Sequence, residues 1–457
     1  MKKNRIIAAA MAAAAMAMVS CTEEKTDKPA AAQPAEQPAA TATEAPAASP
    51  APAAAAAAAP AQAPAAAPAP AMPLGSIKSI DDAIAVIKNK DAIEGLEKLK
   101  AGEQDINTSI YSVLSPITFA VQQKNRDMVA FFLSLGADVN GVATDCKYSS
   151  NTMVMAAAVG DQALVRELVK AGADINLATA SDTPFTSAAS GQDIEMMKTL
   201  VELGADPKAA DPKGRTALMV GLRRNGISMG KIDFKGVADY LIDTCGIDPN
   251  AKDKDGMTAL MHACVFLSVD ELEYLISKGA DPTAKTNKQE GLVYFITKSG
   301  DPAKALDQLK ALEKYNLDFN NGTNEKDITP LYNVISSSMK CKASLPLLEY
   351  MVEHGSRTDV VWGTCGYPTL YVAAGNNIAD GPELLQYLLD KKVGDVNEVN
   401  RYGTTALMNV RKPCMVEPLI KAGADPTIKD KDGKTAYQLK SKDAKLKAAF
   451  EAAGVTE

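Results

Sequence analysis

Residues 253–283 read DKDGMTALMHACVFLSVDELEYLISKGADPT and contain one complete structural unit. Gly256 marks a tight turn, because glycine adopts the positive φ that such a turn requires. Thr258 stands where a helix N-cap would, since its hydroxyl can accept a free backbone N–H. Apolar residues then recur at helical spacing over 259–266 and again over 270–277, and a glycine closes the second run. The stretch predicts a turn followed by two short helices.

The closing turn of this unit returns along the chain at intervals of 29 to 42 residues. Gly-Ala-Asp or related sequences begin at Gly136, Gly172, Gly204, Gly246, Gly279 and Gly423, with weaker copies at Asn316, Gly355 and Gly394. Thr-Ala-Leu or Thr-Pro opens the first helix at Thr183, Thr216, Thr258, Thr329 and Thr405. A period of about 33 residues with a β-turn and two helices is typical of ankyrin repeats, and the chain resembles that family at these residues. The resemblance implies an all-α repeat solenoid of stacked helix-turn-helix units with short hairpin turns.

We expect the repeat domain to span residues 76–457 and to contain about eleven units, with degenerate units at both ends. Residues 79–106 form the expected first unit and residues 430–454 the expected C-terminal cap. Three units carry extra residues between their helices, at about 225–234, 337–344 and 376–382. Inserted loops of this kind are where function most often differs between relatives.

Residues 1–21 have the pattern of a bacterial export signal. Three basic residues precede an Ala/Met-rich run over 6–19, which is too short to span a bilayer. The run ends in Met18-Val19-Ser20-Cys21, which resembles a lipobox, although lipoboxes usually have leucine where Met18 stands. The resemblance implies lipidation of Cys21, palmitate included; an ordinary signal peptide that contains a cysteine is the alternative. Since Thr22 and not aspartate follows, we expect the outer membrane of a bacterial cell envelope, with the protein facing the periplasm or the surface.

Residues 22–75 are rich in alanine and proline and contain few other apolar residues. Such a segment buries too little surface to offset its ordering entropy, and proline breaks the helix that alanine favours. We expect a disordered tether, in which the 46 residues from Pro29 to Leu74 reach roughly 140 Å at about 3.1 Å per residue. This tether would hold the repeat domain far from a lipid anchor.

The overall composition argues against nucleic-acid binding and for a thin, layered core. The formal net charge is −7, and nucleic-acid binders carry a basic face that an acidic chain rarely offers. Aromatic residues make up only 5% of the chain and apolar residues 46%, which suits thin stacked layers better than one thick core. We expect a monomer.

The candidate catalytic and metal motifs are all incomplete. Residues 226–230, GISMG, match the G-x-S-x-G nucleophile elbow, but that motif needs a preceding strand, a following helix and a histidine base. His262 and His354 are the two histidines of the chain and stand far apart, which argues against a zinc site. The runs that begin at Asp253 and Asp430 resemble fragments of calcium loops and lack the remaining ligands. We predict no catalytic site, no metal and no cofactor.

The cysteines other than Cys21 are Cys146, Cys245, Cys264, Cys341, Cys365 and Cys414. In an exported protein an even number allows up to three disulfides, whose pairing the sequence does not reveal. No C-x-x-C occurs, so neither a metal site nor a thioredoxin-like motif is indicated. We expect Cys264, inside a helix, to be a small core residue.

The ankyrin resemblance also implies a binding surface. In that family the hairpin tips and the exposed side of the first helix commonly contact the partner, on the concave face. Transferred by position, this surface comprises Arg215, Arg223 and Arg224 in the fifth unit, Met257 and Phe266 in the sixth, Trp362 and Tyr367 in the ninth, and Arg401 and Tyr402 in the tenth. Tryptophan, tyrosine and arginine dominate interface energetics. The alternative is that these side chains pack between repeats or are merely solvated.

We interpret the chain as a non-catalytic protein–protein interaction module, held at a membrane by a lipid on Cys21 and a flexible tether, that binds an unidentified protein partner. An enzyme or secreted effector with an unrecognised site is one alternative, and a pocket with several perturbed titratable groups would favour it. A passive envelope spacer is the other, and an evenly charged, featureless face would favour that.

Overall fold

The computed structural model describes residues 75–111, 114–141, 150–223, 233–320, 328–336, 344–377 and 381–456. These residues contain twenty-two α-helices and one pair of short strands. Outside them lie the predicted export signal, Cys21, the Ala/Pro-rich linker, Arg224, Cys146, Cys341 and most of the three predicted loop insertions.

The helices form eleven consecutive pairs in the described residues, which we number as units 1 to 11. The first helices of the pairs are α2 (Ile80–Val86), α4 (Pro116–Gln122), α6 (Thr152–Val159), α8 (Pro184–Ser190), α10 (Ala217–Gly221), α12 (Ala259–Ala263), α14 (Leu292–Thr297), α16 (Pro330–Ile335), α18 (Thr369–Ala374), α20 (Ala406–Asn409) and α22 (Ala436–Lys440). The second helices are α3 (Lys90–Lys100), α5 (Arg126–Ser134), α7 (Gln162–Lys170), α9 (Ile194–Glu202), α11 (Phe234–Asp239), α13 (Val269–Ser277), α15 (Pro302–Ala311), α17 (Ser344–Glu353), α19 (Gly381–Asp390), α21 (Val416–Lys421) and α23 (Ala444–Ala452).

Three short helical turns extend second helices. The π-helix η1 (Tyr240–Thr244) continues α11, and the 3₁₀ helices η2 (Glu313–Tyr315) and η3 (Pro413–Met415) flank α15 and α21. The strands β1 (Val361–Trp362) and β2 (Tyr367–Pro368) pair antiparallel, with Trp362 opposite Tyr367, and form the hairpin that precedes α18.

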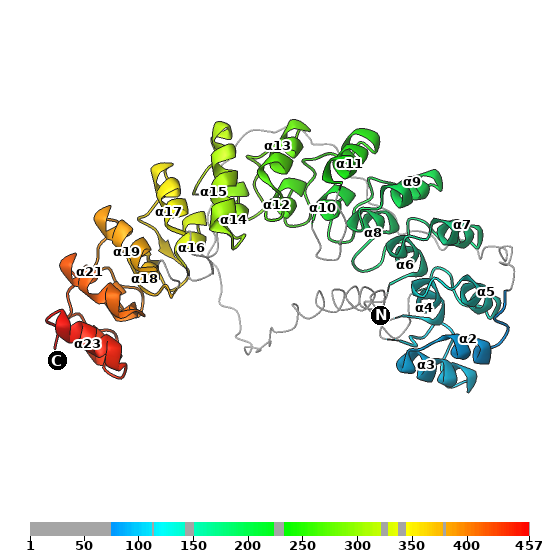
Figure 1. The fold of residues 1–457 in the computed structure, drawn as a ribbon, viewed down its shortest axis with the longest axis horizontal. Coiled ribbons are helices and arrows are strands. Elements are labelled where there is room, and N and C mark those ends of the chain that lie inside the picture. The colour runs from blue at the N-terminus through cyan, green and yellow to red at the C-terminus, as the bar shows by residue number, and fades with distance from the viewer. Residues whose placement is uncertain are drawn as a thin grey trace, which may run out of the picture. The chain divides into compact units, whose positions relative to one another are not determined.

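Each first helix packs on the first helix of the next unit, from α4 through to α22. Second helices pack on second helices between α7 and α9 and from α11 through to α23. Figure 1 shows the first helices in one row and the second helices in another. The predicted all-α repeat solenoid is therefore confirmed. Its apolar side chains form one continuous cluster that runs through the units. Alanines such as Ala156 and Ala157 in α6 and Ala188 and Ala189 in α8 are buried where first helices meet, so the helices approach closely.

The start and stop signals of the sequence act as expected in the unit that spans 253–283. The Met261 backbone N–H donates to Thr258 Oγ1 at 3.5 Å, and Gly279 adopts a φ of 95° after α13. The helix α12, however, ends at Ala263, before the predicted end at Phe266.

A buried side chain from the next unit accounts for the early end of α12. Gln308 in α15 donates from Nε2 to the backbone oxygens of Cys264 (2.9 Å) and Leu267 (2.8 Å), and Lys304 Nζ donates to that of Val265 (3.0 Å). These contacts satisfy carbonyls that a longer helix would have used internally. Periodicity within one unit cannot reveal a partner 41 residues away.

Asparagine side chains connect the closing turns of successive units. Asn250, which ends the turn of unit 5, donates from Nδ2 to Gly279 O at 2.8 Å and accepts at Oδ1 from the Asp281 N–H at 2.7 Å, both in the turn of unit 6. The same pair of bonds is made by Asn140, Asn176, Asn320 and Asn397, each to the turn of the following unit. We call this arrangement the asparagine bridge.

The bridge is absent from the described turns that end in another residue. Lys208, Thr283 and Thr427 occupy the asparagine position in units 4, 6 and 10, and their backbone N–H groups bond to an aspartate of their own turn. A lysine has no acceptor and a threonine side chain is too short to reach the next turn. At these junctions the units are held without the bridge, mainly by apolar packing.

We expect Asn250→Ala to lower the free energy of unfolding by about 1–2 kcal/mol, because it removes two hydrogen bonds between units 5 and 6. The matched control is Lys208→Ala, at the same turn position without a bridge, which should stay within about 0.5 kcal/mol of the wild type. Urea unfolding measures both, and amide hydrogen exchange should show faster exchange at Asp281 in Asn250→Ala alone. Unchanged protection of Asp281 would contradict a stabilising bridge.

Candidate protein-binding surface

The hairpin tips between units are joined by backbone hydrogen bonds. The Lys254 N–H donates to Lys213 O (3.1 Å), which joins the tips of units 5 and 6, and the Asn287 N–H donates to Asp255 O (3.0 Å) in the next junction. The Arg401 N–H donates to Cys365 O at 3.0 Å, joining units 9 and 10. Side chains on these tips are therefore displayed on a backbone that each neighbouring unit holds in place.

Arg215 lies in the tip of unit 5, and its guanidinium is used inside the protein. Its Nε donates to Asp211 Oδ2 at 2.6 Å, and its Nη2 donates to Ser181 O in unit 4 at 3.2 Å. The Arg215 side chain is only 15% exposed and that of Asp211 is fully buried. This ion pair fixes the tip and leaves little of the Arg215 charge for a partner.

His262 lies in the last turn of α12 and is engaged in the same way. Its Nε2 donates to Asp253 Oδ2 at 2.7 Å, in the tip of its own unit. Burial lowers the pKa of His262, against the opposing effect of Asp253, and the nearby positive charges of Arg223 and Arg215 lower it further. The imidazole therefore holds the tip of unit 6 onto α12.

Arg223 follows α10 and is half-buried. Its side chain makes no hydrogen bond or ion pair with the residues that the structure describes. Burial lowers the pKa of Arg223, and the charge of Arg215 adds to the effect. Met257 and Phe266 are also half-buried, and the Met257 N–H donates to Asp253 Oδ1 at 2.8 Å. Arg215 and Arg223 thus lie near His262 of unit 6, and Arg215 is paired inside the fold while the Arg223 side chain has no partner among the described residues.

Trp362 is not on the surface, contrary to its predicted role as a binding residue. The side chain is 1% exposed, its Nε1 donates to Thr329 Oγ1 at 3.2 Å, and its ring packs against Tyr332 with centroids 5.3 Å apart. Thr329 and Tyr332 belong to unit 8, so the indole fills the junction between units 8 and 9. The prediction failed because strand β1 alternates, and Val361 takes the exposed position while Trp362 points inward.

Three other predicted residues come together at the tips of units 9 and 10. Arg401 lies over the ring of Tyr402 at 4.9 Å and donates from Nη2 to Tyr402 Oη at 2.9 Å. Cys365 Sγ lies 3.5 Å from the same Tyr402 Oη. The ring of Tyr367 stacks on that of Tyr371, with centroids 5.2 Å apart and an angle of 13° between the planes.

Cys365 and Tyr371 belong to this cluster and were not among the predicted binding residues. Tyr371 stands four residues after Tyr367, a spacing that the turn from β2 into α18 converts into a stack. Cys365 occupies the hairpin tip between β1 and β2. Neither position follows a family motif, so only the pairing of the two tips identifies them.

The thiol of Cys365 has a distinct environment. Hydrogen bonds from Tyr402 and then Tyr367 lower the pKa of Cys365, and Arg401 adds to the effect. The same contact with Cys365 raises the pKa of Tyr367 to about 12. By contrast, burial raises the pKa of Cys245, and it raises that of the fully buried Cys264 to about 12.

The four cysteines in the described residues, Cys245, Cys264, Cys365 and Cys414, are free thiols. Cys264 is buried in the core as predicted, and Cys146 and Cys341 lie outside the described residues. Within the described residues there is no group of three or more His, Cys, Asp or Glu side chains that could hold a metal ion. No helix in that part of the chain is long and apolar enough to cross a membrane.

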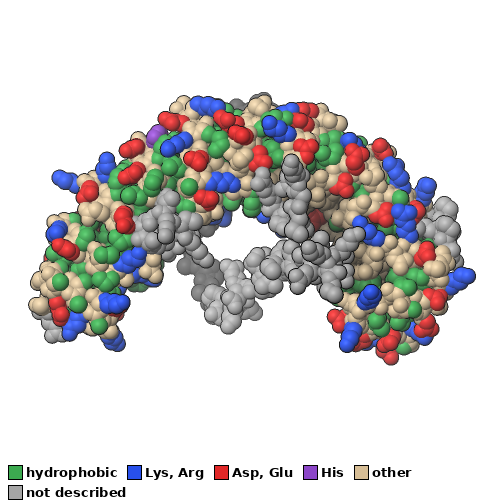
Figure 2. Space-filling view, in the orientation of Figure 1, with side chains coloured by type: hydrophobic (Ala, Val, Ile, Leu, Met, Phe, Trp, Pro, Cys, Tyr) green, Lys and Arg blue, Asp and Glu red, His purple; other side chains and the backbone are tan. Residues whose placement is uncertain are grey.

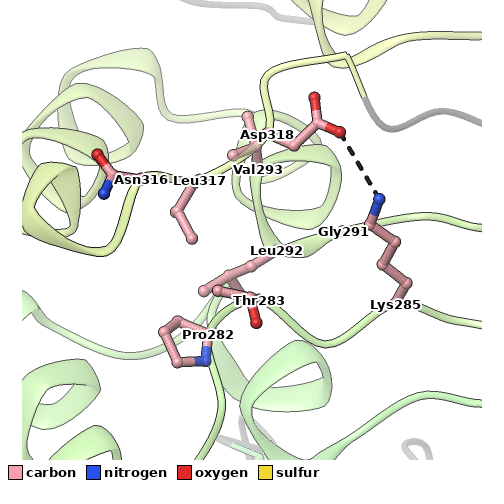
Figure 3. Close-up of a pocket in the computed structure, with 9 residues that line it drawn as sticks. All are labelled: Pro282, Thr283, Lys285, Gly291, Leu292, Val293, Asn316, Leu317 and Asp318. Atoms are coloured by element: carbon pink, nitrogen blue, oxygen red, sulfur yellow. Dashed lines mark ion pairs between the residues drawn. The ribbon is translucent and has the colours of Figure 1, made fainter.

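A small pocket lies at the junction of units 6 and 7, where Thr283 replaces the bridging asparagine (Figure 3). Leu292 and Leu317 contribute apolar walls, and Lys285 and Asp318 form an ion pair of 3.6 Å at its side. The cavity has a volume of about 90 Å³, well below the range of about 300–1,000 Å³ typical of small-molecule sites. Its lining offers no catalytic arrangement.

Surface charge does not single out one region on the face that Figure 2 shows. Acidic and basic side chains alternate along the units there, with apolar side chains between them. Local chemistry at the hairpin tips therefore distinguishes one part of the stack from another better than net charge does.

Comparison with known proteins identifies the repeats. Residues 153–232 and 186–286 match the model of ankyrin repeats in three copies. The chain is 29% identical over 189 residues to the Ankyrin repeat and KH domain-containing protein mask-1 of Caenorhabditis elegans. That aligned region covers 41% of this chain and 7% of mask-1. It is also 31% identical over 147 residues to Alpha-latrocrustotoxin-Lt1a of Latrodectus tredecimguttatus. That aligned region covers 31% of this chain and 9% of the toxin.

The chain thus spans less than a tenth of the length of either curated relative. The two relatives share only the repeat region with this chain. The predicted ankyrin repeats are confirmed. Ankyrin repeats generally serve as protein–protein interaction modules, which fits a binding role for this chain.

We expect iodoacetamide at pH 7.5 to alkylate Cys365 about tenfold faster than Cys245, because the thiolate is the reacting species and the two pKa values are shifted in opposite directions. Tyr402→Phe should slow the reaction of Cys365, since it removes the hydroxyl with the largest effect on that pKa. Time-resolved labelling with peptide mass spectrometry gives each rate. Equal rates at Cys365 and Cys245 would contradict this environment.

Proposed function

We propose that this chain is a non-catalytic protein-binding module that a lipid on Cys21 and an Ala/Pro-rich tether display from a bacterial membrane. The observation that carries the proposal is the row of hairpin tips, which backbone bonds join across units and of which those of units 9 and 10 present Arg401 and Tyr402 to solvent. The ankyrin repeats add their general use in protein–protein recognition. The partner is a protein that contacts the tips and the exposed sides of the first helices.

The joined tips favour binding for a thermodynamic reason. Association loses affinity when loops and side chains must be ordered at the moment of contact. Here the Arg401 backbone is already bonded to Cys365, and the Tyr402 ring is already in contact with the guanidinium. A surface prepared in this way loses less entropy when a partner docks, so modest contacts suffice for specific binding.

The non-catalytic part of the proposal rests on how the titratable groups are used. His262 is bonded to Asp253 and Arg215 to Asp211, so both pairs stabilise tips and neither offers a free acid or base to a substrate. The pocket in Figure 3 is lined by an ion pair and apolar walls. Nucleophilic catalysis needs a nucleophile next to a general base, and the lining of this pocket contains no such pair.

The membrane part of the proposal rests on the N-terminal sequence. Cys21 follows an apolar run and precedes a segment of alanine and proline, which is the order expected of a lipid anchor and a spacer. A tether of roughly 140 Å would let the repeats reach a partner well beyond the bilayer surface. The bacterial cell envelope, and its outer membrane in particular, is the location we propose.

Partner capture tests the binding function. The full chain with a C-terminal tag should capture a protein from envelope extract, and Tyr367→Ala combined with Tyr402→Ala should lower the capture at least about tenfold, since truncating interface aromatics typically costs more than 1 kcal/mol each. Lys445→Gln, an exposed change on α23, is the matched control and should leave capture unchanged. Capture of nothing above a tag-only background would contradict the proposed function, and equal capture by all three proteins would place the surface elsewhere.

We expect Cys21→Ser to move the protein from the membrane fraction to the soluble fraction, because an acyl anchor needs the thiol. Cys414→Ser, which changes an exposed cysteine of the repeats, should remain with the membrane. Cell fractionation followed by immunoblotting measures both. Identical distributions for the two variants would rule out a lipid anchor at Cys21.

A further inference from the structure

The tips of units 9 and 10 differ in charge from the other tips. Residues 361–368 contain no charged side chain, and residues 399–404 contain one, that of Arg401. The tip sequences DPKGRT, DKDGMT and DKDGKT, which begin at Asp211, Asp253 and Asp430, each mix acidic and basic residues. Within a chain of net charge −7, the tips of units 9 and 10 together form an apolar surface with a single positive charge.

Exposed apolar side chains gather on the same two tips. Seven large hydrophobic side chains are exposed in the described residues, and three of them lie here: Val361 (44%), Val399 (46%) and Tyr402 (45%). The stacked, half-buried rings of Tyr367 and Tyr371 add further apolar area. Scattered exposed hydrophobic residues are ordinary, but a group on adjacent tips marks an interaction surface.

The guanidinium of Arg401 pairs with no carboxylate in the part of the chain that the structure describes. Its Nη1 donates to Thr364 O at 3.3 Å and its Nη2 to Tyr402 Oη at 2.9 Å, which are both neutral acceptors. These two bonds orient the guanidinium plane and leave its remaining N–H groups free. Arg215 contrasts with it, because a buried carboxylate already neutralises that side chain.

We propose that the tips of units 9 and 10 dock an extended segment of a protein partner that carries a carboxylate beside a large apolar side chain. The carboxylate pairs with Arg401, and the apolar side chain packs against Tyr402 and the Tyr367–Tyr371 stack. This inference rests on the proposed binding function and adds the chemistry of the partner to it.

Charge complementarity favours a carboxylate over the other classes of ligand. Sites for phosphorylated segments generally use clusters of arginines, and these tips contain a single cation. A purely apolar or proline-rich segment would make no use of an oriented, uncompensated guanidinium. A single arginine–carboxylate pair with aromatic contacts on either side fits the groups that are present.

The test uses a random 12-residue peptide library displayed on phage and selected against the immobilised full chain. Enriched peptides should contain Asp or Glu within two residues of Leu, Ile, Phe, Trp or Tyr. A synthetic copy of the most enriched peptide should bind about tenfold more weakly when its acidic residue is replaced by the amide, and about tenfold more weakly to Arg401→Gln. The two changes together should weaken binding no further, because they remove the same contact.

Two controls make the result specific. Lys431→Gln removes the neighbouring cation of the unit 11 tip, whose backbone N–H still bonds to Tyr402 O, and should leave peptide binding unchanged. Circular dichroism should give the same melting midpoint for Arg401→Gln and Lys431→Gln, since both side chains lie on the surface. Binding of the acidic peptide should also weaken with added salt, because the ion pair is exposed.

Four outcomes would overturn the inference. Selection of peptides without an acidic residue would show that the partner needs no carboxylate. Additive losses of affinity for Arg401→Gln and the peptide amide would show that the carboxylate contacts a group other than Arg401. Failure to enrich any peptide, while the full chain still captures a protein from the envelope, would exclude an extended segment but leave the binding function intact. Failure of both experiments would remove the proposed function together with this inference.

Discussion

The asparagine bridge between closing turns is the polar interaction that recurs most often between the units of this stack. One repeat unit buries too little apolar surface to be stable alone, so its stability comes from its neighbours. The bridge supplies a donor and an acceptor at a fixed place in each turn, as Asn250 does for Gly279 and Asp281. At the five junctions that contain it, the bridge fixes the register in which the apolar faces meet, and the other junctions keep the same stacking by other contacts.

That register also determines the chemistry of the surface. Because successive units are held at a constant offset, their hairpin tips lie close enough for backbone hydrogen bonds, as between Arg401 and Cys365. Charged side chains on some tips then find partners within the stack, as Arg215 does with Asp211, and Asp253 accepts a hydrogen bond from the His262 imidazole of α12. Polar groups used for stability cannot also serve recognition. The tips of units 9 and 10, which contain no carboxylate, leave their arginine available.

The candidate surface could be predicted in part. Tyr367, Arg401 and Tyr402 were expected from their positions in the repeat, and the structure brings them together. Trp362 was expected beside them and is buried, because its partner Thr329 lies 33 residues earlier in the chain. An inward and an outward position alternate along a strand, and a two-residue strand gives too little pattern to tell them apart. Residue type alone favoured exposure of Trp362, and its contacts with unit 8 bury it.

The sequence by itself determined the repeat, its two helices and the turns between them, because these depend on residues within a few positions of each other. Threonine caps, glycine at positive φ and the 3.6-residue spacing all act locally, and they are legible in residues 253–283. Only the tertiary structure decided where α12 ends, which aromatic rings are buried and which charges remain unpaired. Those outcomes depend on contacts such as Gln308 to Leu267 and Arg401 to Thr364, whose partners are 41 and 37 residues apart. These contacts form, and stabilise the protein, only after the units have stacked.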